Sequence, residues 1–198
     1  MKNIKGPNKN ETYYKMYDIN GNLKGTIEKS KEKSLEDNMW LKGVSCFVLN
    51  QDNKVLIEKR ANKGLTPGKL DLCSGHIDSD EIPTQAMIRE LKEELGIELE
   101  ESMDVIKLTE QPSPLVFESS GKKKNFLIDF YCLKRKMSNV ITQKEEVADV
   151  AWIDMEKCFE LIRTGNTKFP ANYDYEVIFQ KVRDLVKPRN IEDDKLRD

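Results

Sequence analysis

Residues 75–97 read GHIDSDEIPTQAMIRELKEELGI, and this stretch holds the clearest helix signal in the chain. Its apolar residues recur every three to four positions, which predicts a helix over 81–95 with one core-facing side. Pro83 suits the first turn, where its missing N–H costs nothing. Gly96 suits the left-handed residue that follows the last turn. The candidate N-caps are the two aspartates just before the helix, Asp78 and Asp80.

Three carboxylates share another side of this expected helix. At about 100° per residue, Glu90, Glu93 and Glu94 fall within one arc, with Arg89 at its edge and Lys92 well off it. Such a run is usually a solvated face, but a solvated face normally mixes charges because like charges one turn apart repel. Glu94 also lies in the last turn, where the helix dipole disfavours an anion. The alternative is a bound hard cation, Mg²⁺ or Mn²⁺, which prefers oxygen ligands.

Length and composition bound the remaining possibilities. The 198 residues fit one domain with terminal extensions, and the net charge of -2 argues against a protein that binds nucleic acid polymers. No apolar run approaches the roughly 20 residues of a membrane span, and the first residues lack the apolar core of a secretory signal. The four cysteines form no CxxC pair, so we expect reduced, buried thiols in a cytoplasmic protein. With a single His in the chain, we do not expect the cysteines to form a zinc site.

Strand-like runs lie on both sides of the helix. Asn20-Gly21 predicts a hairpin between strands at 13–19 and 24–28. The other expected strands are 40–50, 54–59, 70–73, 105–109, 126–133 and 147–153. The other expected helices are 155–163 and 173–186. A basic turn is expected at residues 121–124, whose lysines either are solvated, as at most hairpin tips, or steer an anion. Strands before and after a central helix, with helices at the end, indicate an α/β or α+β sandwich.

The stretch at 75–97 resembles the Nudix box, G-x5-E-x7-R-E-U-x-E-E-x-G-U, with U an aliphatic residue. Every fixed position matches: Gly75, Glu81, Arg89, Glu90, Leu91, Glu93, Glu94, Gly96 and Ile97. The loop with Pro67-Gly68 and the acidic run before Trp152 are also similar to Nudix domains. Residues 17–25 look like the leading hairpin of a branch related to isopentenyl-diphosphate isomerase. Together the likeness covers roughly residues 13–165, and it implies the Nudix fold, an α/β (α+β) arrangement of a mixed β-sheet sandwiched between helices, with an N-terminal β-hairpin extension.

The resemblance implies an enzyme that cleaves a nucleoside diphosphate linked to another moiety, with Mg²⁺ or Mn²⁺ assisting the attack of water. The metal ligands implied are Glu90, Glu93 and Glu94, helped by a backbone carbonyl near Gly75. Glu93 is either the third ligand or a base. Arg89 reaches Glu93 one turn away and is expected to orient it.

Several roles outside the box carboxylates stay open. The general base is expected outside the box, and Glu146 ranks ahead of Glu145, although both also read as solvated loop acids. Arg60 ends a strand that leads towards the site, so it either binds a substrate phosphate or is solvated. His76 occupies a position that the family pattern leaves free, so we do not expect a ligand there. The aromatic residues that either line the pocket or fill the core are Trp40, Phe47, Phe117, Phe126 and Phe169.

We expect an N-terminal hairpin and linker over 1–38 packed on the core, a Nudix domain over 39–187 and a mobile charged tail over 188–198. Residues 1–10 are expected to be frayed. The expected partner is a small-molecule diphosphate, with no nucleic acid polymer and no membrane, and the resemblance allows a homodimer. Nucleoside triphosphates, nucleotide sugars, dinucleotides and coenzyme A all remain open as substrates.

Two alternatives compete with the hydrolase. The first is an isopentenyl-diphosphate isomerase, which uses a Cys before Gly-His. Aligning Gly75-His76 puts Ser74 rather than Cys73 at that position, and a single His cannot supply a site with several imidazoles. The second is a non-catalytic Nudix module that binds a nucleotide. Such modules usually lose the box glutamates, and this chain keeps them.

Overall fold

The protein is described from a computed structural model, which covers residues 13–62, 66–78, 80–99, 104–119, 121–137 and 140–187. The expected fraying of residues 1–10 and the expected tail over 188–198 lie outside these ranges. Among the described helices, none has the length and apolar character needed to cross a membrane.

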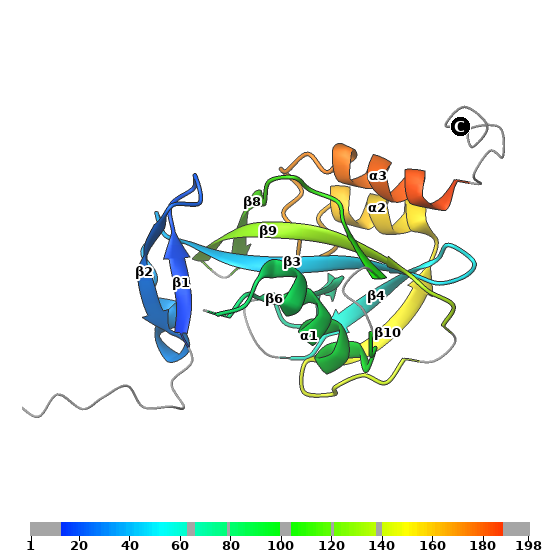
Figure 1. The fold of residues 1–198 in the computed structure, drawn as a ribbon, viewed down its shortest axis with the longest axis horizontal. Coiled ribbons are helices and arrows are strands. Elements are labelled where there is room, and N and C mark those ends of the chain that lie inside the picture. Colours follow the sequence, from blue (N-terminus) through cyan, green and yellow to red (C-terminus); the bar gives the residue numbers. More distant parts are fainter. Residues whose placement is uncertain are drawn as a thin grey trace, which may run out of the picture.

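A mixed sheet forms the centre of the molecule (Figure 1). Its middle strands are β3 (Trp40–Leu49) and β9 (Lys122–Lys134), which run parallel over their full paired length. Antiparallel neighbours extend the sheet on both sides. They are β4 (Val55–Arg60), β5 (Leu70–Asp71), β6 (Cys73–His76), β7 (Val105–Lys107), β8 (Ser113–Ser119) and β10 (Val147–Ile153).

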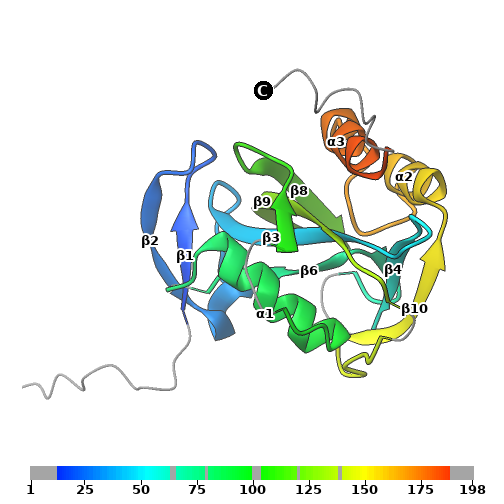
Figure 2. The ribbon, with the colours of Figure 1, turned by 45° about the vertical axis from the view of Figure 1, so that its right-hand side comes forward.

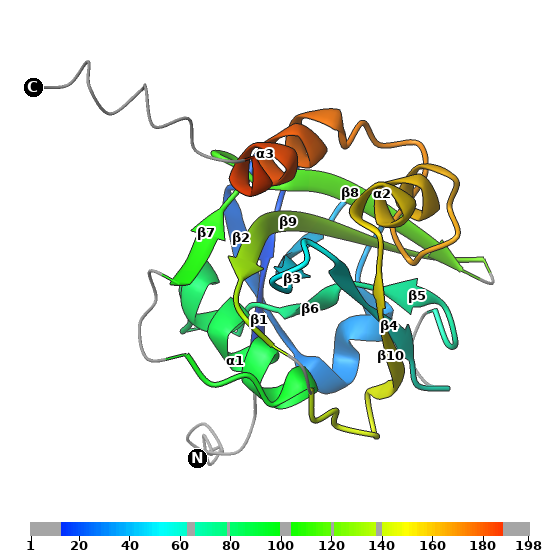
Figure 3. The ribbon, with the colours of Figure 1, turned by 90° about the vertical axis from the view of Figure 1, so that its right-hand side faces the viewer.

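Helices cover both faces of this sheet. Helix α1 (Pro83–Leu95) lies on one face, while α2 (Met155–Arg163) and α3 (Glu176–Val186) lie together on the other (Figures 1 and 3). Because side chains alternate along a strand, β3 sends Cys46 towards α1 and Phe47 towards α2 and α3. The predicted α+β sandwich of a mixed sheet between helices is confirmed.

Helix α1 begins and ends almost where the sequence predicts. Pro83 occupies its first turn, and Gly96 follows its last turn with a φ of 63°. The expectation that Asp78 or Asp80 caps the helix is wrong: the N-cap is Ile82, which has no capping side chain. Instead the side chain of Gln85 accepts a hydrogen bond from the Ile82 N–H at 3.2 Å. The side chain of Gln85, in the first turn, therefore satisfies the backbone N–H of Ile82, which would otherwise bond only to solvent.

The predicted N-terminal hairpin is present. Strands β1 (Tyr13–Tyr17) and β2 (Leu23–Glu28) pair antiparallel, and the short 3-10 helix η1 (Lys29–Ser34) leads to β3 (Figure 2). Asp18 Oδ1 accepts hydrogen bonds from the N–H groups of Asn20 and Asn22, which fixes the turn. The pairing of Tyr17 with Trp40 joins the hairpin to the central sheet.

The prediction of a turn at 121–124 is wrong for its three lysines, which lie in a strand. Strand β9 already begins at Lys122 and pairs with β8, a strand that the sequence pattern does not predict. Pro114 lies within β8 and argues against a strand. It is tolerated because, among the described strands, β8 pairs only with β9 and so has a free edge.

Candidate functional site

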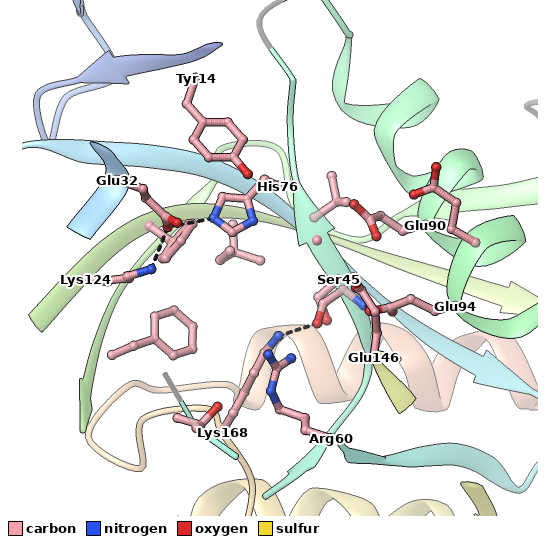
Figure 4. Close-up of a pocket in the computed structure, with 18 of the residues that line it drawn as sticks. Tyr14, Glu32, Ser45, Arg60, His76, Glu90, Glu94, Lys124, Glu146 and Lys168 are labelled. Atoms are coloured by element: carbon pink, nitrogen blue, oxygen red, sulfur yellow. Dashed lines mark hydrogen bonds and ion pairs between the residues drawn. The ribbon is translucent and has the colours of Figure 1, made fainter. Parts of the chain in front are cut away.

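A pocket of about 440 Å³ opens between the second half of α1 and strand β6. Three groups of residues line it (Figure 4). They are the box glutamates, the basic residues Arg60 and Lys168, and residues of the N-terminal segment. A volume of this size lies in the range of small-molecule sites, roughly 300–1,000 Å³. The pocket therefore has room for a ligand larger than a diphosphate alone.

Glu90 and Gly75 approach each other very closely. A Cβ at position 75 would overlap the Glu90 carboxylate, so glycine at this position is what lets Glu90 lie where it does. Arg89 holds the same carboxylate through Nη1 at 2.7 Å. Glu90 is buried, and burial raises the pKa of its carboxyl group although the charge of Arg89 opposes the rise.

Glu94 is buried deeper in the same wall. Its Oε2 accepts a hydrogen bond from the Ser74 N–H at 3.0 Å, which ties the end of α1 to β6. Burial, followed by the charges of Glu90 and Asp71, raises the pKa of the Glu94 carboxyl to about 8. Glu93 differs from both: its side chain is half exposed at the rim of the pocket.

Arg89 connects the loop before α1 with the carboxylates on the helix. Its Nε and Nη2 donate to the two carboxylate oxygens of Glu81, at 2.7 and 2.9 Å. Nη2 also donates to the backbone oxygen of His76, and Nη1 donates to Glu93 at 3.0 Å. The expected contact with Glu93 is present, and the contacts to Glu81 and His76 go beyond it. Arg89 is thus fully engaged with protein acceptors.

The donor chemistry of this wall fits a hard divalent cation. Glu90 and Glu94 supply buried carboxylates, and removing carboxylates from water is unfavourable unless a cation compensates them. All the side-chain donors are oxygen atoms, the type that Mg²⁺ and Mn²⁺ prefer. The Mg²⁺ or Mn²⁺ that the family implies would be held by Glu90, Glu93 and Glu94 with the Gly75 carbonyl.

Among the described residues, one group of potential metal-ligating side chains lies close together, and it contains Glu94 rather than all three box glutamates. Potential ligand atoms of Glu58, Cys73 and Glu94 lie within 4.8 Å of one another, and all three residues are buried. Glu58 Oε1 has no hydrogen-bond partner among the described residues. Sequence reasoning missed Glu58, although its alternation with Leu56 on β4 placed it on the face that packs against α1.

Two basic residues lie in the pocket wall near Glu94, which shares Ser74 with one of them. Arg60 Nη1 and Lys168 Nζ both contact Asp71 Oδ2, at 2.9 and 2.7 Å, and Lys168 also contacts the Ser74 hydroxyl. Arg60 also lines the pocket, which a contact with a substrate phosphate would require. Lys168 was missed because it follows α2 and has no local motif. It reaches the site because residue 167 forms a bridge with Leu70 of β5.

The N-terminal hairpin supplies the third side, which sequence reasoning also missed. The Tyr14 ring stacks on His76 with centroids 4.6 Å apart. Glu32 Oε1 contacts His76 Nε2 at 3.0 Å and Lys124 Nζ at 2.7 Å (Figure 4). The expectation that Lys124 is solvated is wrong, since this ion pair holds it half-buried in the pocket wall.

The remaining candidates separate clearly. Glu146 lines the pocket and Glu145 does not, within the described residues. Of the aromatic residues, Trp40 and Phe47 lie in the core and do not line the pocket, Phe126 lines the pocket, and Phe117 and Phe169 do both. The four cysteines are free and buried, as expected.

Comparison with known proteins identifies the family. The NUDIX domain matches residues 39–173. The isopentenyl-diphosphate Delta-isomerase of Rhizobium rhizogenes is 29% identical over 145 residues, which cover 72% of this chain and 68% of the relative. The 8-oxo-dGTP diphosphatase of Escherichia coli is 40% identical over 51 residues, 26% of this chain and 40% of that enzyme.

Solved structures agree on the fold. A protein from Deinococcus radiodurans superposes with a TM-score of 0.60 at 20% identity, covering 88% of this chain and 99% of the other. The match of the NUDIX domain over most of the chain, on a mixed sheet between helices with the complete box on α1 and the strand before it, establishes that the chain belongs to the Nudix hydrolase family.

Proposed function

We propose that the protein is a Nudix pyrophosphohydrolase that cleaves the diphosphate linkage of a nucleoside diphosphate derivative with water. The observation that carries the proposal is one pocket that Glu90, Glu93 and Glu94 line together with Arg60 and Lys168. A diphosphate needs cationic partners on its oxygens and an activated water at phosphorus. This pocket offers residues for both tasks.

The residues divide these tasks among them. Glu90, Glu93 and Glu94, with the Gly75 carbonyl, are the proposed ligands of Mg²⁺ or Mn²⁺. When bound, such an ion offsets phosphate charge and lowers the pKa of a water ligand. Arg60 is the proposed phosphate-binding residue, and Lys168 lies beside it on Asp71.

Proton transfer and positioning fall to the other side chains. Glu146 is the proposed general base, because its side chain lines the pocket whereas that of Glu145 does not. Glu93, at the exposed rim, is the second candidate. Arg89 is the proposed positioning residue, since its contacts to Glu81, Glu90 and Glu93 fix the carboxylates relative to one another. We place the enzyme in the cytoplasm, acting on a small-molecule substrate, with a homodimer allowed.

An isopentenyl-diphosphate isomerase is the second candidate, because the relative from Rhizobium rhizogenes carries that name. The pocket favours the hydrolase. Ser74 lines it, whereas Cys73 is 1% exposed and points into the α1 side of the core. His76 is the chain's only histidine, and it is engaged by Glu32 and Tyr14.

The experiment is a panel of diphosphate compounds assayed for phosphate and nucleoside monophosphate release, with Mg²⁺, with Mn²⁺ and with EDTA. The panel includes isopentenyl diphosphate, assayed for its allylic isomer. Metal-dependent release from a nucleoside diphosphate derivative supports the hydrolase. Isomer formation without any hydrolysis would replace it with the isomerase. Metal-dependent binding without turnover of any member would favour a non-catalytic module.

A further inference from the structure

Part of the pocket wall comes from outside the family-matched region. Tyr14 of β1 and Lys29 and Glu32 of η1 line the pocket, although the NUDIX match begins at residue 39. In Figure 4, Tyr14, His76 and Glu32 gather on one side of the pocket, away from Glu90 and Glu94. The N-terminal segment therefore adds a surface that the family-matched region alone lacks.

The contacts of this segment concentrate on pocket residues. Lys29 Nζ pairs with Asp78 Oδ1 at 2.6 Å, in addition to the contacts of Tyr14 with His76 and of Glu32 with His76 and Lys124. None of the described side chains of residues 13–32 is fully buried. Polar pairs and ring stacking at the pocket, rather than an apolar core, thus hold this wall in position.

The chemistry of the wall disfavours a further phosphate. Its two lysines are already paired, Lys29 with Asp78 and Lys124 with Glu32. Burial opposes ionisation of Glu32, but the hydrogen bonds and charges of His76 and Lys124 prevail and lower its pKa to about 2. An ionised carboxylate accepts hydrogen bonds and repels anions. Beside it, the Tyr14 and His76 rings stack on each other, with Lys29 Nζ over the Tyr14 ring and the Phe126 ring edge-to-face with His76, so this wall presents ring edges to the pocket.

We propose that Tyr14, Glu32 and His76 form a binding subsite for the nucleoside part of the substrate, with the diphosphate held at the box glutamates and Arg60. The proposal rests on the proposed diphosphate chemistry and adds where the rest of the substrate binds. Ribose hydroxyls or base amino groups donate to the Glu32 carboxylate, and the base packs against the edges of the stacked Tyr14 and His76 rings.

The same subsite discriminates against a hydrocarbon. An isopentenyl group carries no hydrogen-bond donor and no ring. Placed against this wall, it would remove water from the Glu32 carboxylate without replacing the lost hydrogen bonds, which is unfavourable. The hairpin therefore selects substrates by the group attached to the diphosphate.

The test measures binding to the full-length protein by calorimetry in Mg²⁺. The probes are the methylene-bridged analogues of ADP and UDP, which water cannot cleave, and methylenediphosphonate, which is the diphosphate part alone. The variants are Glu32→Gln and Tyr14→Leu. The matched control is Tyr17→Leu, an aromatic residue of the same strand that packs on Lys42 and does not line the pocket.

We expect Glu32→Gln and Tyr14→Leu each to lower the affinity for the nucleoside analogues about tenfold. This is the usual effect of losing a hydrogen bond to a charged group or a ring contact. Affinity for methylenediphosphonate should not fall in either variant, because Glu32→Gln removes a charge that repels anions, and no affinity should fall in Tyr17→Leu. The subsite is refuted if neither nucleoside analogue binds wild type more tightly than methylenediphosphonate, or if the control weakens binding equally. Failure of methylenediphosphonate itself to bind would instead refute the diphosphate site and so the proposed function.

Discussion

Replacing Gly75 by alanine adds one methyl group at the closest contact in the site. The new Cβ would overlap the carboxyl carbon and both carboxylate oxygens of Glu90. The φ of Gly75 does not lie in the left-handed region, so backbone strain adds nothing to this overlap. Glu90 must either be compressed in place or rotate away and break its 2.7 Å contact with Arg89.

Both responses lower the free energy of unfolding by a similar amount. Overpacking by one methyl group in a closely packed region costs about 1–3 kcal/mol. Losing a hydrogen bond to a charged group costs about 1.5–3 kcal/mol. With a urea slope of about 2 kcal/mol per molar, a loss near 2 kcal/mol lowers the unfolding midpoint by roughly 1 M. Because Glu90 would leave its position, metal-dependent turnover should fall by about 10² or more.

Urea unfolding followed by circular dichroism measures the stability, and metal-dependent hydrolysis of the best panel substrate measures the activity. The control is the same substitution in a Glu90→Ala background, where the overlapping carboxylate is absent. There Gly75→Ala should have little further effect on stability, since the two residues interact directly. An unfolding midpoint and turnover equal to wild type in the single variant would show that Glu90 does not occupy the described position.

Three further predictions concern the same wall. Glu94→Gln should lower metal-dependent turnover about 10²-fold or more while the fold is kept, whereas Glu145→Gln, outside the pocket, should match wild type; equal loss in both variants in steady-state kinetics would contradict the assignment. Cys73→Ser should leave hydrolysis nearly intact, and a large loss of kcat would mean that the thiol takes part. In EDTA, burial raises the pKa of Glu94 to about 8 in the folded protein. Between about pH 4.5 and 8 the folded protein therefore keeps a proton on Glu94 that the unfolded chain has released. Melting temperature should therefore fall as pH rises from about 4.5 to 8, and Glu94→Gln should flatten this slope; a wild-type slope unchanged in the variant would exclude Glu94 as its source.

Local sequence rules were sufficient for the helix that carries the box. The 3.6-residue period places Met87 and Leu91 in the core and gathers the glutamates on another face, and Gly96 ends the helix with its positive φ. The hairpin at Asn20-Gly21 and the last helices follow from equally local patterns. These features depend on residues within a few positions of one another, so the sequence alone determined them.

Only the tertiary structure decided which other residues meet these glutamates. Lys168 arrives from the loop after α2, and Glu58 is buried because β4 lies between covered faces. Strand β8, with its Pro114, forms because β9 offers a pairing edge. Tyr14 and Glu32 reach His76 across more than forty residues of chain. Sheet register and the docking of distant segments set these contacts, and no local period encodes them because the partners share no neighbouring sequence.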